Sequence, residues 1–327
     1  MTALERKVAV VAGATRGAGR GIARMLGETG AVVYCTGRST TEKPATGHHA
    51  GRPETIDETA ALVTAAGGVG IAVRVDHATE AEVAALFARV REERGRLDLL
   101  VNVLGGPPSN DIRPFWELPF EDGRAMVDGW LWPHVATARH ALPLMVEQGA
   151  GLVVEVLESH RIGAHGELYF DLAVTALQRL AYMLAEQLTP HHVTALAIAP
   201  GFMRTEAVLA HFGATEESWR EVARSSEAAR GFGLAGSETP CFVGRAIGAL
   251  AADADVARWS GGLYGSWELS DAYGFTDVNG ERPHWGRYFA TNFPKLADAR
   301  PRTGRRWVVQ DLTAPSVGSP PKRRAGR

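Results

Sequence analysis

The sequence predicts an α/β fold in which a doubly wound parallel sheet is covered by helices on both faces. Three observations lead to this fold class: short apolar, β-branched runs recur along the chain, longer amphipathic stretches separate them, and a glycine-rich turn follows the first run. Strands that are apolar on both faces belong in a parallel sheet buried on both sides. A chain of 327 residues is long enough to build a core of its own.

The elements are expected in regular alternation. Strands are expected at residues 8–12, 32–36, 71–75, 97–103, 152–157 and 193–199, with a last one near 262–267. Helices are expected at residues 18–28, 54–66, 80–93, 122–148, 168–188 and 241–252. The strand runs are short and continuously apolar, whereas the helical stretches repeat apolar residues with a period near ~3.6. No internal repeat goes beyond this alternation.

Two segments interrupt the pattern. Residues 39–53 are rich in Gly, Pro and His and predict a long loop after the second strand. Residues 202–240 follow the sixth strand and are expected to form a helical lid over the substrate, with Trp219 on a helix. We expect a single domain over residues 1–312. Residues 313–327, rich in Pro, Gly, Ser and basic side chains, are expected to be a disordered tail.

The composition excludes several function classes. The formal net charge is −2, whereas a nucleic-acid-binding surface is normally basic. No apolar run reaches the ~18–20 residues of a membrane span, and no signal-peptide pattern opens the chain. The two cysteines form no disulfide framework, and the adjacent histidine pairs lack the further ligands of a metal site. We therefore expect a cytoplasmic protein with a small-molecule substrate and with no nucleic-acid, membrane or metal partner.

A glycine-rich turn follows the first strand and opens the first helix. It reads Gly13-Ala-Thr15-Arg16-Gly17-Ala-Gly19. Glycine lets the backbone turn tightly and approach a pyrophosphate, while the free N–H groups and the helix dipole favour negative charge. Because a strand precedes this turn and a helix follows it, the pattern predicts a Rossmann-like dinucleotide site.

The end of the second strand indicates which dinucleotide binds. Proteins that select NAD usually carry an acid here for the ribose 2′-hydroxyl, but this segment reads Tyr-Cys-Thr-Gly-Arg38. Arg38, together with Arg16, is suited to a 2′-phosphate. We therefore predict NADP(H) as the cofactor.

The Gly-x-x-x-Gly-x-Gly spacing resembles that of the short-chain dehydrogenase/reductase (SDR) family. Further segments resemble the family's Asn-Asn-Ala-Gly and Pro-Gly-x-x-x-Thr motifs, and residues 238–283 resemble a branch containing the human DHRS-type enzymes and bacterial relatives. The resemblance implies an oxidoreductase. It implies these further cofactor contacts: Asp76, Asn102, Gly105, Pro200, Gly201 and Thr205.

The resemblance also implies assembly through the long helices at 122–148 and 168–188. The second of these helices carries more apolar residues than one buried stripe needs, namely Leu172, Leu177, Leu180, Tyr182, Met183 and Leu184. We expect a homodimer or a homotetramer.

The catalytic tetrad of the family, Asn–Ser–Tyr–Lys, is degenerate in this chain. Leu157 and Glu158 stand where a Ser-Ser pair is expected. If Tyr169 is the catalytic tyrosine, the lysine position holds Ala173; in the other register, Phe170 and Val174 occupy the two places. The asparagine position corresponds to Asp128.

These replacements disfavour ordinary reversible alcohol oxidation. A tyrosine without a neighbouring lysine is a poor general base near neutral pH, because its ordinary pKa is near ~10. Other acids fall in the same region, and a carboxylic acid in an apolar cleft can donate or accept a proton. We take Glu158, Tyr169, Asp171 and Asp128 as the candidate catalytic residues, with His160 and His165 nearby.

Three functions remain open at this point. The first is an NADPH-dependent reductase of an activated C=N, C=C or C=O group, for which a Tyr–Lys pair matters little. The second is a redox-neutral cyclase, dehydratase or isomerase that keeps NADP(H) in its pocket while Glu158 or Asp171 performs acid–base work. The third is a non-catalytic NADP(H)-binding protein.

Overall fold

Seven strands form one parallel sheet in the computed structural model, which describes residues 3–106, 113–158 and 168–294. The strands are β1 (Val8–Ala12), β2 (Val32–Gly37), β3 (Val69–Arg74), β4 (Leu99–Asn102), β5 (Gly151–Val156), β6 (Val193–Ala199) and β7 (Leu263–Gly265). Their order in the sheet is β3-β2-β1-β4-β5-β6-β7. The order reverses between β1 and β4, and open α/β sheets bind ligands at the carboxyl ends of strands at such a point.

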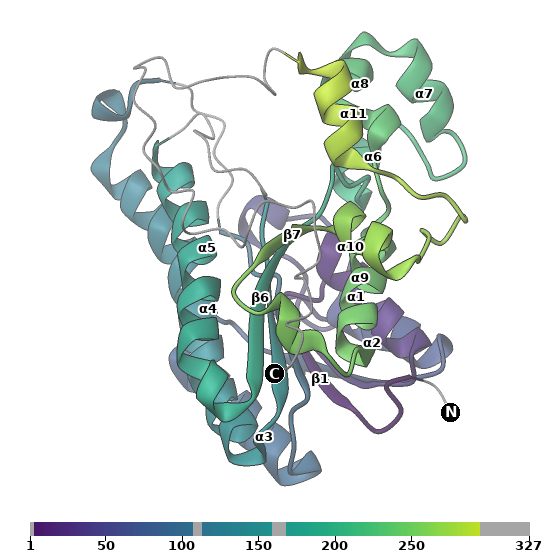
Figure 1. The fold of residues 1–327 in the computed structure, drawn as a ribbon. Coiled ribbons are helices and arrows are strands. Elements are labelled where there is room, and N and C mark those ends of the chain that lie inside the picture. Colours follow the sequence, from purple (N-terminus) through teal and green to yellow (C-terminus); the bar gives the residue numbers. More distant parts are fainter. Residues whose placement is uncertain (1–2, 107–112, 159–167, 295–327) are drawn as a thin grey trace, which may run out of the picture.

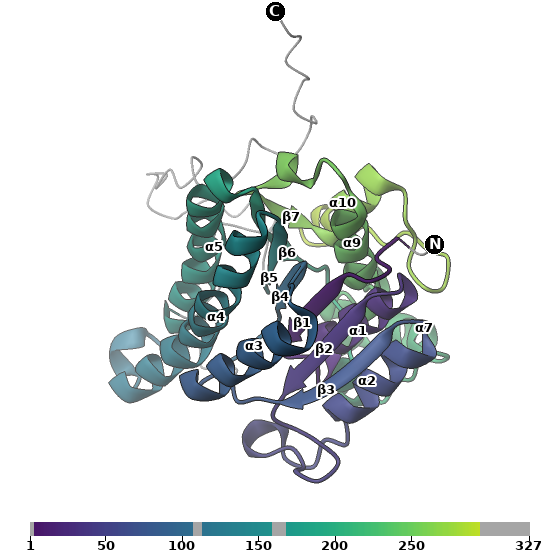
Figure 2. The ribbon, with the colours of Figure 1, turned by 90° about the horizontal axis from the view of Figure 1, so that it is seen from below.

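Helices cover both faces of the sheet, which confirms the predicted fold class (Figures 1 and 2). One face carries α1 (Gly17–Glu28), α2 (Ile56–Ala65) and α9 (Pro240–Ala252). The opposite face carries α3 (Glu80–Arg94), α4 (Phe120–Gln148) and α5 (Leu168–Leu188). Within the described residues, no helix combines the length and apolar character that a membrane span requires.

The core consists of two apolar layers, one on each face. Val11 and Val101 belong to the layer under α1 and α9, whereas their neighbours Val10 and Leu100 belong to the layer under α3, α4 and α5. Successive strand side chains point to opposite faces, so a central strand must be apolar throughout to fill both layers. This requirement explains the continuous apolar runs in the sequence.

The edge strand β3 begins earlier than the sequence predicted. It begins at Val69, two residues before the expected start at residue 71, and Val69 is 48% exposed. The sequence does not show this start clearly, because Gly70 interrupts the apolar run of the strand. A Cβ there would lie 2.0 Å from the carbonyl oxygen of Ala60, so α2 packs directly on the backbone of the strand. The other expected strands and helices shift by one or two residues at most ends.

The lid segment, residues 202–240, contains α6 (Glu206–His211), α7 (Trp219–Ser225) and α8 (Glu227–Phe232). Trp219 lies on a helix, as expected, and packs with Ala223, Ala229 and Leu234 in a small core separate from the sheet. Figure 1 shows these helices grouped with α11 (Trp285–Asn292) at one end of the molecule.

Two further helices were not expected from the sequence: α10 (Ser266–Tyr273) and α11 (Trp285–Asn292). Short 3-10 turns are η1 (Gly47–His49), η2 (Phe115–Glu117), η3 (Thr189–His191), η4 (Leu234–Gly236) and η5 (Val256–Trp259). The expected tail at residues 313–327 lies outside the described residues.

Candidate active site

The glycine-rich turn packs directly on the end of β4. Gly13 has a φ of +93°, and a Cβ at this position would lie 2.4 Å from the carbonyl oxygen of Val103. A Cβ at Gly19 would lie 2.1 Å from the carbonyl oxygen of Gly13. Only glycine therefore fits both positions. The turn leaves the amino end of α1 at the carboxyl edge of the sheet.

The Pro-Gly segment after β6 reaches the same place. The methyl group of Thr205 would lie 3.4 Å from a Cβ at Gly17, the first residue of α1. Pro200 and Gly201 are buried directly after β6. Thr15, in the turn, is also buried and lies against Gly37 at the end of β2. The structure thus brings together motifs that lie far apart in the sequence.

The two arginines expected at a 2′-phosphate have different surroundings. Arg38 is exposed directly after β2, and no described residue forms an ion pair with it. The Arg16 side chain is largely buried and lies 3.5 Å from the carboxylate of Glu54, which also binds Arg52 at 2.5 Å. Burial lowers the pKa of Arg16, although Glu54 opposes this shift. Glu54 and Arg52 were not expected from the sequence.

A buried carboxyl group links the end of β4 to α4. Glu155, on β5, accepts a hydrogen bond from Nδ2 of Asn102 at 2.8 Å through Oε1. Its Oε2 lies 2.5 Å from Nδ1 of His134 on α4. His134 Nε2 lies 2.9 Å from the carbonyl oxygen of Leu104. These contacts form a closed cycle that begins and ends in the segment 102–104, beside the glycine-rich turn.

The geometry fixes how many protons this cycle holds. A carbonyl oxygen only accepts, so Nε2 of His134 carries a hydrogen and donates it to Leu104. One more proton is shared between Nδ1 of His134 and Oε2 of Glu155. Wherever that proton lies, the pair has no net charge. This neutrality is what allows the two side chains, both with no exposed surface, to be buried in the sheet.

A second buried histidine extends the polar groups toward β2. His77 lies 2.8 Å from the hydroxyl of Thr36 through Nε2 and 3.0 Å from the hydroxyl of Thr137 through Nδ1. Burial lowers the pKa of His77 to about 3, so it is neutral near physiological pH. A neutral ring donates through one nitrogen only, so one threonine must donate its hydrogen to the ring. Thr137 is bound to the Pro133 carbonyl at 2.6 Å and Thr36 to the Val11 carbonyl at 3.1 Å, so the threonine that donates to the ring shares its hydrogen with a carbonyl oxygen.

The remaining residues expected to contact the cofactor lie at the same edge of the sheet. Asp76 follows β3 and accepts a hydrogen bond from the N–H of Ala78. Gly105 is exposed after β4, and the ring of Trp130 would contact a Cβ at Gly106. The Oδ1 atom of Asn102 is buried without a hydrogen-bond partner. Small residues, the exposed Arg38 and the unsatisfied Oδ1 of Asn102 lie at this edge, and together they fit a dinucleotide.

The positions expected to hold the tetrad are mostly apolar. Leu157 is 2% exposed and packs with Ala173, which has no exposed surface. Val174, in the place that the alternative register gives to a lysine, is also buried. Glu158 is exposed at the end of β5. Core packing therefore fills the space beside the tyrosine in either register.

Tyr169 lies against the backbone of α4. Its ring atoms would be 2.4 Å from a Cβ at Gly123, so the ring rests directly on that glycine. Asp171 is half-exposed in the first turn of α5. Asp128 is exposed on α4 and forms an ion pair with Arg124 at 3.6 Å, away from the buried tetrad positions. His160 and His165 lie outside the described residues.

Residues 13–255 match the family model described as enoyl-(acyl carrier protein) reductase. The chain is 30% identical over 279 residues to human "Dehydrogenase/reductase SDR family member 1", covering 84% of each protein. The mouse protein of the same name is 31% identical over 282 residues, 85% of each protein.

The chain belongs to the short-chain dehydrogenase/reductase family of oxidoreductases.

Solved structures share the fold. A short-chain dehydrogenase from Mycobacterium thermoresistibile superposes with a TM-score of 0.69 at 20% identity, covering 86% of this chain and 92% of that one. An actinorhodin polyketide ketoreductase variant with NADPH gives 0.62 at 23% identity, covering 79% and 95%. A metagenomic short-chain oxidoreductase with NADP gives 0.58 at 23% identity, covering 78% and 94%.

Neither lysine that the structure describes can take the place of the SDR tetrad lysine. Lys7 precedes β1 and forms an ion pair with Asp98 just before β4, so it lies at the amino edge of the sheet. Lys43 is exposed in the loop after β2. The SDR fold is thus present in this chain, while the residues expected at the lysine position are Ala173 or Val174.

A second buried carboxyl group lies beneath the Pro-Gly segment that borders the nicotinamide in SDR proteins. Glu238 accepts hydrogen bonds from the N–H of Gly201 at 3.0 Å and from the Ser266 hydroxyl at 2.7 Å. Burial raises the pKa of Glu238 to about 8. Its other oxygen has no partner. No signal in the sequence marks this group, because Glu238 stands in a polar segment where a solvent-exposed glutamate is ordinary.

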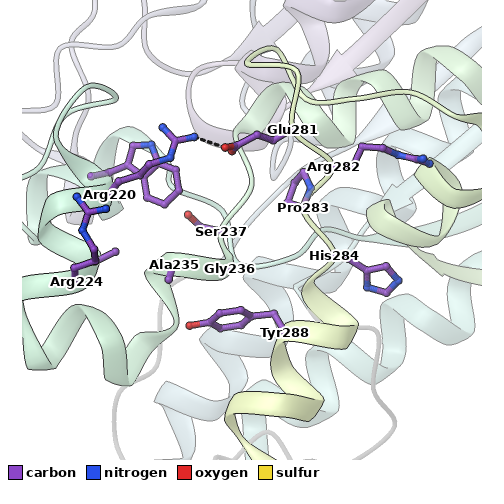
Figure 3. Close-up of a pocket in the computed structure, with 12 residues that line it drawn as sticks. Arg220, Arg224, Ala235, Gly236, Ser237, Glu281, Arg282, Pro283, His284 and Tyr288 are labelled. Carbon is purple, nitrogen blue, oxygen red and sulfur yellow. Dashed lines mark hydrogen bonds and ion pairs between the residues drawn. The ribbon is translucent and has the colours of Figure 1, made fainter.

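A pocket of about 440 Å³ lies elsewhere, between α7, residues 235–237 and residues 281–288 (Figure 3). Its lining arginines already have partners: Arg220 binds Glu281, and Arg282 binds the Ser270 carbonyl. Tyr288 in its wall stacks on Trp285, which in turn contacts Phe202 beside the Pro-Gly segment. This aromatic stack lies between the pocket and the carboxyl edge of the sheet, where the glycine-rich turn and the Pro-Gly segment meet. We therefore place the candidate site at that edge.

Substitution of Glu155 tests the buried cycle. Glu155→Gln should change the free energy of unfolding by less than ~1 kcal/mol, because an amide can accept from Asn102 and donate to neutral His134. Glu155→Leu should cost ~2–5 kcal/mol, because it leaves two buried polar groups unpaired. Urea denaturation of both variants measures the difference. If the two variants lose equal stability, the pair is ionised and needs its charge.

Glu238 should make stability depend on pH. The folded protein holds its proton up to about pH 8, whereas an unfolded glutamate releases it near its ordinary value of 4.5. The free energy of unfolding should therefore fall as pH rises through this window. Thermal melts from pH 5 to pH 8 should show that the free energy of unfolding of Glu238→Gln increases relative to that of the wild type as pH rises. The difference should reach up to a few kcal/mol at pH 8. Glu92→Gln, on the exposed face of α3, is the control; parallel curves for all three proteins would contradict the assignment.

Proposed function

We propose that this chain is an NADP(H)-dependent SDR oxidoreductase with a non-standard active site. It would reduce an activated C=N, C=C or C=O group of a small organic substrate. The observation that carries the proposal is the convergence of the amino end of α1, the exposed Arg38 and the Pro-Gly segment at one edge of the sheet. The NADPH and NADP present in the two SDR structures cited above support the same cofactor.

The residues present fit NADP(H) better than NAD(H). The amino end of α1 is suited to the diphosphate, because its N–H groups and dipole favour anions. Arg38, exposed directly after β2, is placed to pair with a 2′-phosphate. Arg16 can share this role only as far as its ion pair with Glu54 allows. When bound, the reduced nicotinamide supplies a hydride.

The apolar tetrad positions support an activated substrate. Leu157 and Ala173 offer no hydroxyl or ammonium group to polarise a carbonyl. An iminium ion accepts a hydride and becomes a neutral amine without any added proton, and a strongly polarised enone needs little help. The loss of the Tyr–Lys pair is therefore tolerable for such substrates. The lid segment at residues 202–240 would cover the substrate.

Where a proton is needed, we propose Glu158 as its donor. It stands at the exposed end of β5, in the SDR serine position. Tyr169, held on Gly123, would hydrogen-bond the substrate, and Asp171 in the same first turn would assist. Asp128 forms an exposed ion pair with Arg124, so we give it only a supporting role on α4.

A redox-neutral cyclase, dehydratase or isomerase is the second candidate. The observation that favours it is the same apolar packing of Ala173 and Val174, which removes the usual support for hydride chemistry on a simple ketone or alcohol. In this case NADP(H) would remain in the pocket unchanged, and Glu158 or Asp171 would transfer the proton. The third candidate, a non-catalytic NADP(H)-binding protein, would bind NADPH and form no product.

Assembly stays a prediction. On α5, Leu177 and Leu184 are buried, whereas Leu172 is 51% and Met183 37% exposed. The helix is thus apolar on its outer face as well, which supports the homodimer or homotetramer expected from the sequence.

Calorimetry tests the cofactor. The wild type should bind NADPH more tightly than NADH, and Arg38→Ala should weaken NADPH by ~1–3 kcal/mol while leaving NADH nearly unchanged. Arg91→Ala is the control, because Arg91 carries the same charge on α3 and pairs with Glu147. Equal affinities of the wild type for the two cofactors would rule out the proposed selectivity.

Two conservative variants test the chemistry on a panel of cyclic imines, enones and ketones. Tyr169→Phe should keep most activity, as should the control Tyr182→Phe on the same helix. Glu158→Gln should lower turnover by ~10²–10⁴-fold wherever a proton is required, because it keeps shape and abolishes proton transfer. Product formation and NADPH consumption are measured together.

The same data separate the candidates. An iminium reductase survives both substitutions and requires NADPH, whereas a redox-neutral enzyme loses activity with Glu158→Gln and consumes none. A large loss in Tyr169→Phe with Glu158→Gln nearly normal would mean that Tyr169 still acts as the SDR tyrosine.

A further inference from the structure

A carboxylate from the lid segment touches the amino end of α1. The N–H of Gly17 donates to Oε2 of Glu206 at 3.0 Å. Among the described residues no other side chain caps this helix: Arg16 at the N-cap makes no side-chain cap, and the first turn holds no acid. Orphan N–H groups and the helix dipole make such an end attractive to anions. Glu206 therefore occupies a position that suits the cofactor's diphosphate.

The negative charge of Glu206 is only weakly compensated. Its other oxygen lies 3.8 Å from Arg20, but Arg20 forms a closer pair with Glu58 at 2.5 Å. The Glu206 side chain is 34% exposed, so water can take over its hydrogen bond if it leaves. The diphosphate of a cofactor can therefore replace the Glu206 carboxylate at the amino end of α1.

Glu206 is firmly attached to the lid segment. It is the first residue of α6, directly after Thr205, whose hydroxyl caps that helix. Val208 and Leu209 of α6 pack with Trp219 in the small core of the lid segment. A displacement of Glu206 would therefore move α6 together with the helices that pack against it.

We propose that Glu206 competes with the cofactor's diphosphate for the amino end of α1 and thereby couples cofactor binding to the attachment of the lid segment. Like charges a few ångströms apart repel, whether the carboxylate leaves or stays. The coupling is reciprocal: whatever detaches Glu206 strengthens cofactor binding, and the cofactor loosens α6. This inference rests on the proposed nicotinamide cofactor.

Calorimetry with NADPH and with inorganic pyrophosphate tests the competition. Glu206→Gln keeps the size of the side chain and removes its charge, so it should bind both probes about tenfold more tightly than the wild type. Glu28→Gln removes an equal charge from the other end of α1, where Glu28 pairs with Arg245. It should change either Kd by less than about twofold. Unchanged Kd values for both probes in Glu206→Gln would overturn the competition.

Hydrogen exchange tests the coupling without any turnover. In the wild type, NADPH or pyrophosphate should speed the exchange of the α6 amides. In Glu206→Ala, these amides should exchange fast without ligand and respond to neither probe. A thermal melt confirms that each variant is folded. If NADPH and NADH fail to bind the wild type while pyrophosphate still loosens α6, the proposed function is wrong and the competition stands. Slower α6 exchange with both probes would contradict the coupling.

Discussion

The neutral pair formed by Glu155 and His134 is the interaction on which the candidate site depends. A carboxyl group in the middle of a parallel sheet costs several kcal/mol unless its charge is balanced and its oxygens are bound. Here both oxygens have partners, and the shared proton leaves no net charge. The same bonds hold Asn102 and Leu104, and with them the end of β4. The stability of the sheet and the shape of its ligand-binding edge therefore have one source.

The effects of this pair reach the cofactor edge through backbone contacts. Val103, inside the cycle, is the residue against which Gly13 packs. Two features therefore fix the position of the glycine-rich turn. Hydrogen bonds hold the segment 102–104, and the missing Cβ of Gly13 lets the turn approach Val103. His77 extends the polar groups toward the end of β2. A polar layer, wholly buried, runs beneath the edge where the dinucleotide is proposed to lie.

The positions expected to hold the tetrad depart further from the SDR pattern than the scaffold does. Leu157, Ala173 and Val174, at the positions expected for the SDR serine and lysine, are apolar and buried. Polar groups instead lie deeper, in the Glu155 cycle and around Glu238, where no substrate can touch them. A scaffold that binds a nicotinamide cofactor and a pocket with few polar groups favour substrates that are already activated. The polar chemistry of such a site therefore depends on the few carboxylates near its surface, Glu158 and Glu206 among them.

By itself, the sequence determined the α/β class, nearly every strand and the glycine-rich turn, because the period of apolar residues and the need for glycine are local properties. It also predicted which residues of the SDR tetrad are replaced, a prediction that stays untested. Only the tertiary structure decided the partners of the remaining polar residues. A glutamate inside the apolar run of β5 is a visible anomaly, but its partner His134 lies on another element and has no local signal. Glu54 beside Arg16, Glu206 at Gly17 and the burial of Glu238 have the same cause: a buried or bridging charge is defined by what the fold brings next to it, and residues far apart in sequence carry no mark of that proximity.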